Sequence, residues 1–308
     1  MPDFHRIAEN FAGLTGTVRA GCWITASAIS YALMISIVRK VAPGIHVFEI
    51  VFFRSLFAIL FMIPWISRQG LSALHTPKIG LLGLRGLGAF IASSCLFHAV
   101  TLMPLGEMMA ISFSRPIFGS IAAILFLGEV ASGRRWSAIL VGFAGALIII
   151  RPGIQVLNAG TIFVLIAICA QVMNTIIIKY VTRSTKPDTI ALFHGVFITP
   201  MALIPTLFVW TTPDAEQLMW LLGAGATSML VQRTLMRGFA ATDATMVLAF
   251  NFIRLPTAAL AGFLFFAEVP EIWVWIGGGV IFASSILLAQ RENALERGSA
   301  EQDRSKGV

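Results

Sequence analysis

Long apolar runs separated by short polar segments dominate the chain, and this pattern predicts membrane-spanning helices. A helix needs about 20 apolar residues to cross the hydrocarbon layer of a bilayer. Ten spans are predicted, at residues 18–38, 45–66, 79–102, 105–127, 137–150, 159–181, 189–210, 218–240, 244–266 and 272–290. Because the connections between them are short, we expect an all-α integral membrane protein with no domain outside the membrane.

One segment of the first half returns in the second half with the same pattern. Residues 105–136 and 244–275 align at one constant offset, here called the repeat offset, which pairs Arg115 with Arg254 and Glu129 with Glu268. The duplication predicts two repeats of five spans each, an odd number, so the repeats must insert with opposite topology. The predicted organisation is a cytoplasmic segment 1–17, repeats 18–151 and 152–290, and a cytoplasmic tail 291–308.

The composition agrees with a membrane protein. Of the 308 residues, 57% are hydrophobic and only 12% are charged, whereas a soluble protein would be about 25% charged. The three cysteines are odd in number and form no metal-binding motif, so neither disulfides nor zinc are expected. The net charge of +7 does not indicate nucleic-acid binding, because the basic residues lie between the spans and at the chain ends.

The distribution of these basic residues predicts the orientation. Cytoplasmic segments of membrane proteins carry an excess of Lys and Arg. With the N-terminus inside, thirteen lie on the cytoplasmic side: Arg6, Arg19, Arg68, Lys78, Arg134, Arg135, Lys179, Arg183, Lys186, Arg291, Arg297, Arg304 and Lys306. The opposite side then has three, Arg39, Lys40 and Arg151. The protein is therefore predicted to lie in the cell (inner) membrane, with both termini in the cytoplasm.

Arg115 and Arg254 are the first candidates for a substrate-binding site. A charged side chain at mid-membrane costs about 3 kcal/mol on insertion scales, so it usually faces a polar cavity or a partner. Ser112 and Asn251 each precede one of these arginines by three positions, which places both members of a pair on one helix face. The duplicated polar pair favours a cavity. The alternative is that both arginines pair with Glu107 or other carboxylates and lock the bundle.

Further residues support the same candidate site. Arg85, Arg233 and Glu107 are predicted to be supporting charges, and Phe113 and Phe252, next to the polar pairs, are candidates to stack on a flat substrate. Arginines outnumber acidic residues within the spans, and an uncompensated positive cavity would attract an anion such as a carboxylate, which arginine binds in a bidentate way.

Other polar residues are interpreted as structural. For Arg54, Arg85 and Arg237 we favour a reach to the headgroup boundary or an ion pair. Helix-end, loop or satisfied polar contacts are expected for Glu49, Glu129, Glu268, His98 and His194. The chain has no P-loop, no nucleophile with a base and no paired carboxylates at catalytic spacing, which weighs against an enzyme. No cofactor is expected.

Three stretches resemble a known family. The sequences FEIVFFRSLFAILFMIP, MPLGEMMAISFSRPIFGSIAAILFLGE and GFAGALIIIRPG are similar to the EamA family of the drug/metabolite transporter superfamily. The resemblance covers about residues 20–290 and implies a ten-helix inverted-repeat carrier. It implies a cavity lined largely by spans one, three, four, six, eight and nine, with spans five and ten peripheral. Mid-span arginines at both Arg115 and Arg254 depart from the general family pattern and favour an anionic or zwitterionic metabolite over a cationic drug.

The predicted function is secondary transport of a small metabolite by alternating access, the substrate being amino-acid-like, carboxylate-bearing or otherwise anionic or zwitterionic. An exporter of drugs or toxic compounds, a channel-like facilitator and a lipid-directed membrane subunit are the alternatives. The expected partners are the small-molecule substrate, the lipid bilayer, and a coupling proton or counter-substrate, with no nucleic acid. The oligomeric state is left open between monomer and homodimer.

Overall fold

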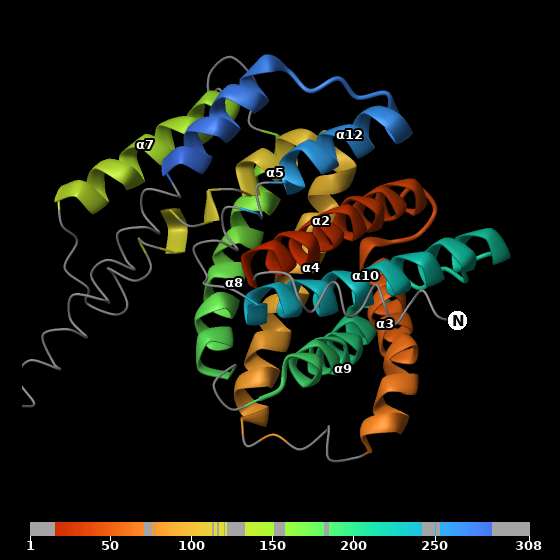
Figure 1. Cartoon of the computed structure of the whole chain (residues 1–308). Coiled ribbons are helices and arrows are strands. Elements are labelled where there is room, and N and C mark those ends of the chain that lie inside the picture. The colour runs from red at the N-terminus through yellow and green to blue at the C-terminus, as the bar shows by residue number, and fades with distance from the viewer. Residues whose placement is uncertain are drawn as a thin grey trace, which may run out of the picture.

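The computed structural model describes residues 16–70, 76, 78–112, 114, 115, 117–119, 121, 133–150, 158–181, 185–241, 250 and 253–284. The regular elements within these residues are all helices (Figure 1). They are α2 (Gly16–Val41), α3 (Val47–Gln69), α4 (Ile79–Leu102), α5 (Leu105–Ser112), α7 (Gly133–Ile150), α8 (Ala159–Val181), α9 (Pro187–Thr206), α10 (Ala215–Ala241), α12 (Arg254–Phe266) and a further helix, Ile272–Ser284.

Five of these helices are long and apolar enough to cross a bilayer, namely Val18–Val41, Val47–Gln69, Ile79–Leu102, Ala159–Ile178 and Asp188–Thr206. They coincide with the predicted first, second, third, sixth and seventh spans. Large apolar side chains such as Leu84, Ile162 and Ile204 are more than half exposed, a surface that lipid rather than water would cover. The chain is thus a multi-pass membrane protein.

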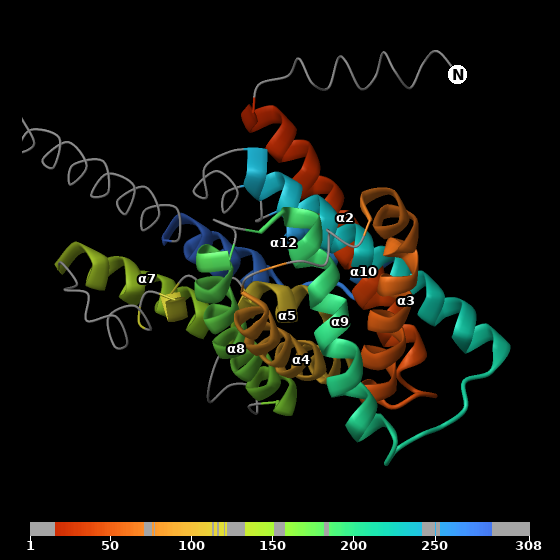
Figure 2. The same ribbon diagram turned by 90° about the horizontal axis from the view of Figure 1, so that it is seen from below.

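The strongest helix contacts join the first half of the chain to the second. In both views, α2 lies along α10 and α4 lies along α8 (Figures 1 and 2), and α3 packs against α9 and α10. The repeat offset carries α2 onto α8, α3 onto α9 and α4 onto α10. When each helix is replaced by its equivalent in the other half, the α2–α10 contact corresponds to the contact between α8 and α4. In the same way, the α3–α10 contact corresponds to the contact between α9 and α4. All four contacts are present.

Two glycines at equivalent positions allow these helices to approach closely. A Cβ at Gly86 of α4 would lie 2.4 Å from the Cβ of Phe197 on α9. The repeat offset carries Gly86 onto Gly225 of α10, where a Cβ would lie 2.4 Å from the Cβ of Phe57 on α3. Side-chain atoms cannot be that close, so only glycine fits at these two crossings.

The predicted fourth and ninth spans are not continuous helices in the described residues. α5 ends at Ser112, and Ser114 forms a turn in which its N–H donates to the carbonyl of Ile111 at 2.9 Å. α12 begins only at Arg254, after a turn in which the N–H of Ile253 donates to the carbonyl of Phe250 at 3.1 Å. A proline lies just after each arginine and cannot supply the N–H that a continuous helix needs, which favours an interruption at each place.

The predicted fifth and tenth spans pack on each other. A Cβ at Gly145 of α7 would lie 3.0 Å from the carbonyl of Gly277, so their backbones meet closely. α7 lies at the edge of the bundle in both views (Figures 1 and 2). These small residues permit the close packing of the two helices.

Candidate functional site

A cavity of about 240 Å³ lies between the two halves of the chain. Its described lining comes from α2, α3, α4, α5, α8, α9, α10, α12, the 272–284 helix and Arg115, which follows α5. The spans expected to line it do so, but α3, α9 and the 272–284 helix also contribute. Phe282 lines the cavity, so the interpretation of the tenth span as wholly peripheral is wrong.

Four arginines line this cavity, namely Arg54, Arg85, Arg115 and Arg254. Three of them are deeply buried, with Arg54 and Arg85 each 4% exposed and Arg254 8% exposed. No aspartate or glutamate occurs among the described lining residues. A guanidinium keeps its charge in proteins, so the described lining has a strong positive charge.

Arg54 is held by neutral groups. Its Nη1 donates to the hydroxyl of Ser228 at 2.9 Å, and its Nη2 donates to the hydroxyls of Ser55 and Ser93, each at 3.4 Å. Its guanidinium carbon also lies 5.3 Å from the ring centre of Phe97, a cation–π geometry. These contacts orient the guanidinium without neutralising it.

Arg85 and Arg254 are held in the same manner. Arg85 Nη1 donates to the backbone carbonyl of Ile190 at 3.3 Å. Arg254 Nη2 donates to the hydroxyl of Ser27 at 3.1 Å, and its guanidinium lies 5.0 Å from the ring centre of Tyr31. Tyr31 itself lines the cavity. A serine hydroxyl, a carbonyl and an aromatic face again provide dipoles rather than a counter-charge.

Each of the four arginines retains an unpaired donor. The Nε atoms of Arg54, Arg85, Arg115 and Arg254 are buried and have no hydrogen-bond partner among the residues that the structure describes. An unpaired donor of a charged group costs about 1–3 kcal/mol or more. Four such donors belong to arginines that line one cavity, so unpaired hydrogen-bonding capacity and positive charge are concentrated there.

Neutral polar groups complete the lining, with Gln171, Asn174 and Thr175 from α8 and Gln232 from α10. With its amide oriented to suit its neighbours, Asn174 donates to the carbonyl of Arg85 and accepts from the N–H of Ala89, each at 3.0 Å. Asn174 therefore both faces the cavity and joins α8 to α4.

His194 on α9 also lines the cavity. Its Nε2 lies 3.2 Å from the side-chain nitrogen of Gln232. An amide nitrogen only donates, so Nε2 is the acceptor in this contact. The buried Nδ1 has no partner within the described part of the chain, so the expected satisfied contact of His194 is found at one ring nitrogen only.

The structure brings together some of the predicted site residues. Ser112, Arg85, Arg115 and Arg254 line the cavity. Glu107 is not among the described lining residues, although it lies on α5 close to them in sequence. Phe113, Asn251 and Phe252 fall outside the described residues.

Arg233 lies elsewhere. Its Nε donates to Asp188 at 3.1 Å, which joins α10 to the start of α9, and it is not one of the described lining residues.

Arg54 is the main residue of the cavity that the sequence did not assign to the site. The sequence favours a headgroup contact or an ion pair for Arg54 and Arg85, yet both side chains are buried in the cavity. Arg237 is exposed and lies over Trp23, at 5.2 Å from its ring centre.

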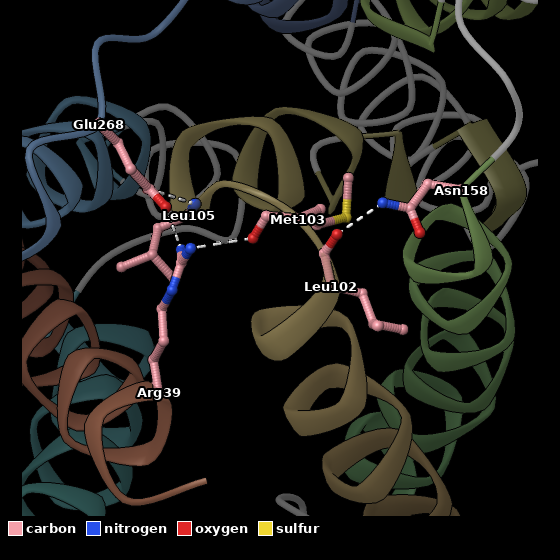
Figure 3. Close-up of polar contacts among 6 residues, drawn as sticks. All are labelled: Arg39, Leu102, Met103, Leu105, Asn158 and Glu268. Atoms are coloured by element: carbon pink, nitrogen blue, oxygen red, sulfur yellow. Dashed lines mark hydrogen bonds and ion pairs between the residues drawn. The ribbon is translucent and has the colours of Figure 1, made fainter. Parts of the chain in front are cut away.

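A cluster of contacts closes the helix ends next to α5 (Figure 3). Glu268 forms an ion pair with Arg39 and accepts from the N–H of Leu105 at 3.0 Å, while Arg39 donates to the carbonyl of Met103 at 3.4 Å. Asn158 donates to the carbonyl of Leu102 at 2.5 Å. These contacts, here called the Glu268 cluster, join α2, α4, α5, α8 and the segment after α12. The helix-end contact expected of Glu268 is present.

Comparisons with known proteins agree with this architecture. The model of the EamA-like transporter family matches residues 18–151. An S-adenosylmethionine uptake transporter of Rickettsia prowazekii is 25% identical over 88% of this chain and 92% of its own length. A riboflavin transporter of Vibrio cholerae is 27% identical over 91% of this chain and 96% of its own length. A pseudopaline exporter of Pseudomonas aeruginosa is 26% identical over 86% of this chain and 93% of its own length.

One solved crystal structure has a TM-score of 0.60 at 13% identity and covers 88% of this chain and 99% of that one, which shows a similar fold. The relatives are named as transporters of small molecules, and the prediction that the chain is not an enzyme is confirmed. The match of the EamA-like transporter model to the first half of the chain and the similarity of these relatives over most of its length place the chain in the EamA/drug-metabolite transporter superfamily.

Proposed function

We propose that this transporter is a secondary carrier that moves a small anionic, carboxylate-bearing metabolite across the cell membrane by alternating access. The observation that carries the proposal is the cavity with four arginines and no described carboxylate in its lining. A cationic solute would meet repulsion there, and burying it would add to an already uncompensated charge. The substrates named for the relatives differ from one another, so they do not indicate a particular substrate for this chain.

The binding site proposed is Arg115, Arg254 and Ser112, with Asn251 as the equivalent of Ser112, and with Arg85 and Arg54 as further cationic groups. Arg115 and Arg254 both lie at helix interruptions, where backbone groups lose their helical partners. Discontinuous helices at a repeat interface are the usual place for substrate in secondary transporters. The exchange symmetry of the helix contacts supports inverted repeats at residues 18–151 and 152–290.

The proposed orientation puts both termini in the cytoplasm, on the charge distribution of the sequence. The Glu268 cluster then lies at the outer end, because α2 runs outward from the N-terminus to Arg39. Tight contacts at that end and a cavity between the halves are the arrangement expected of a carrier closed to the outside.

A thermal-shift screen in detergent tests the proposal. A ligand that binds the folded state alone stabilises it by RT ln(1 + [L]/Kd), about 2.7 kcal/mol at a hundredfold excess over Kd. Carboxylates should raise the melting temperature of the wild type, and Arg254→Gln and Arg115→Gln should abolish the shift. Arg237→Gln is the matched control, because Arg237 is exposed and outside the described cavity lining. Stabilisation by cations alone, or by carboxylates in all three variants equally, would refute the proposed site.

Flux measurements separate the carrier from its alternatives. In proteoliposomes, a carrier shows saturable uptake that is accelerated by substrate on the opposite side. A channel-like facilitator would show neither saturation nor exchange. A lipid-directed subunit would bind no soluble ligand in the thermal-shift screen.

A further inference from the structure

Resting on the proposed function, we infer that the substrate carries at least two anionic groups, which the cavity binds at the same time. One group contacts Arg115 and Arg254, here called the repeat pair, and the other contacts Arg54 and Arg85, here called the first-half pair. The inference concerns the class of substrate, a small dianion, and the division of the cavity into two anion subsites.

Charge balance is the first argument. The described lining holds four arginines and no carboxylate, and the groups that contact Arg54, Arg85 and Arg254 are hydroxyls, a carbonyl, a thioether and aromatic rings. Charged groups in mid-membrane need compensation by partners of opposite sign. A single carboxylate would compensate one arginine and leave most of the charge unpaired. A dianion compensates twice as much of the positive charge, and the contacts that the arginines already make need not change.

The arrangement of the arginines in the repeats is the second argument. Arg115 and Arg254 are equivalent under the repeat offset, so each half supplies one member of the repeat pair. The positions equivalent to Arg54 and Arg85 are Phe193 and Ala224, which are apolar. The first-half pair therefore has no counterpart in the second half. It adds a second anion subsite beside the symmetric one rather than duplicating it.

The geometry of the donors is the third argument. Arg85 uses Nη1 for the carbonyl of Ile190, and its buried Nε has no hydrogen-bond partner among the described residues. The edge formed by Nε and Nη2 is the one through which arginine binds a carboxylate with two parallel hydrogen bonds. Arg254 likewise has a buried Nε that no described residue contacts as an acceptor. Each subsite thus keeps a donor for one anionic group.

The size of the cavity limits what can be attached to these groups. A volume of about 240 Å³ is below the range of about 300–1,000 Å³ that is typical of pockets for drug-sized ligands. A compact solute fits this volume better than a large conjugated one. Unbranched dicarboxylates of three to six carbons are therefore suitable probes.

The test compares each dicarboxylate with its own monomethyl ester, which has nearly the same size but one charge fewer. Malonate, succinate, glutarate and adipate are titrated against the purified wild-type protein by thermal shift. At least one dicarboxylate should bind about tenfold or more tightly than its ester, because the ester loses one set of charge-assisted hydrogen bonds. An ester that matches its acid in every case, or no stabilisation by any dicarboxylate, overturns the inference.

Variants then assign the subsites. Arg85→Gln should bring the acid and the ester to similar, weak affinity, and so should Arg254→Gln, since each removes part of one subsite. Arg237→Gln should keep the wild-type preference. The wild-type comparison stands even if a variant fails to fold. If monocarboxylates bind through the arginines as well as dicarboxylates do, the proposed anion transport survives and the dianion inference fails. If only cations bind, both fail.

Discussion

Glu268 and Arg39 form an ion pair that joins the segment after α12 to the last turn of α2 (Figure 3). Both side chains are mostly buried, at 15% and 23% exposure. The carboxylate of Glu268 also accepts from the N–H of Leu105, at the start of α5, where the helix dipole favours a negative charge. One carboxylate therefore satisfies an arginine and a helix N-terminus from the opposite half of the chain.

Glu268→Gln should lower the free energy of unfolding by about 1–3 kcal/mol. The loss lies between the small value of an exposed ion pair and the larger value of a buried one. Urea or thermal unfolding in detergent measures it. Glu216→Gln is the control, because Glu216 and Lys40 are exposed and 4.0 Å apart, and such pairs contribute about 0–1 kcal/mol. Equal effects of the two substitutions would show that the Glu268 cluster is not a specific contact.

The same pair should restrict access to the cavity from that end of the molecule. In a variant with its three cysteines replaced by alanine, Ser112→Cys places a reporter thiol at the cavity, which Ser112 lines. Arg39→Ala should raise the rate at which an impermeant thiol reagent, added from the Glu268 side, modifies that thiol. The physical reason is that loss of the ion pair shifts the equilibrium toward the open state. An unchanged rate would mean that other contacts keep this end closed.

The two close crossings of the bundle predict a symmetric pair of packing defects. Gly86→Ala and Gly225→Ala should each lower stability by about 1–3 kcal/mol, because each new Cβ would lie 2.4 Å from a phenylalanine Cβ. Gly80→Ala is the control, since Gly80 is in α4 and no described atom lies within 4 Å of the added Cβ. It should be neutral or slightly stabilising, as alanine favours helix. Thermal unfolding of the three variants distinguishes these outcomes.

The repeat pair could be predicted from the sequence, because a charged residue inside an apolar run is visible without a structure, and here it occurs twice. Arg54 and Arg85 were harder to interpret, since an arginine in a span can reach lipid headgroups or line a cavity. The choice depends on which helix face meets the other half, and that is set by packing between residues far apart in sequence. The prolines favour both helix interruptions but do not dictate them, because α3 and α9 continue through internal prolines. The interruptions coincide with local turns at Ser114 and Ile253.

We expect Arg233 to stabilise the fold without binding the substrate. The sequence suggested that it supports the substrate site, whereas it donates to Asp188 and lies outside the described cavity lining. Arg233→Gln should therefore keep the ligand-induced rise in melting temperature that Arg254→Gln abolishes. It should still lower the melting temperature of the ligand-free protein, since both partners of the pair are about three-quarters buried and breaking it leaves Asp188 without its counter-charge.

The charge-exchanged double variant completes this test. Asp188→Arg combined with Arg233→Asp restores an ion pair between α9 and α10, and it should recover part of the stability that Arg233→Gln loses. Recovery of stability with ligand binding unchanged throughout would fix the pair as a structural contact. If Arg233→Gln instead removes ligand binding while its unfolding temperature stays at the wild-type value, Arg233 acts on the substrate, and the cavity must extend toward α9 when substrate is bound.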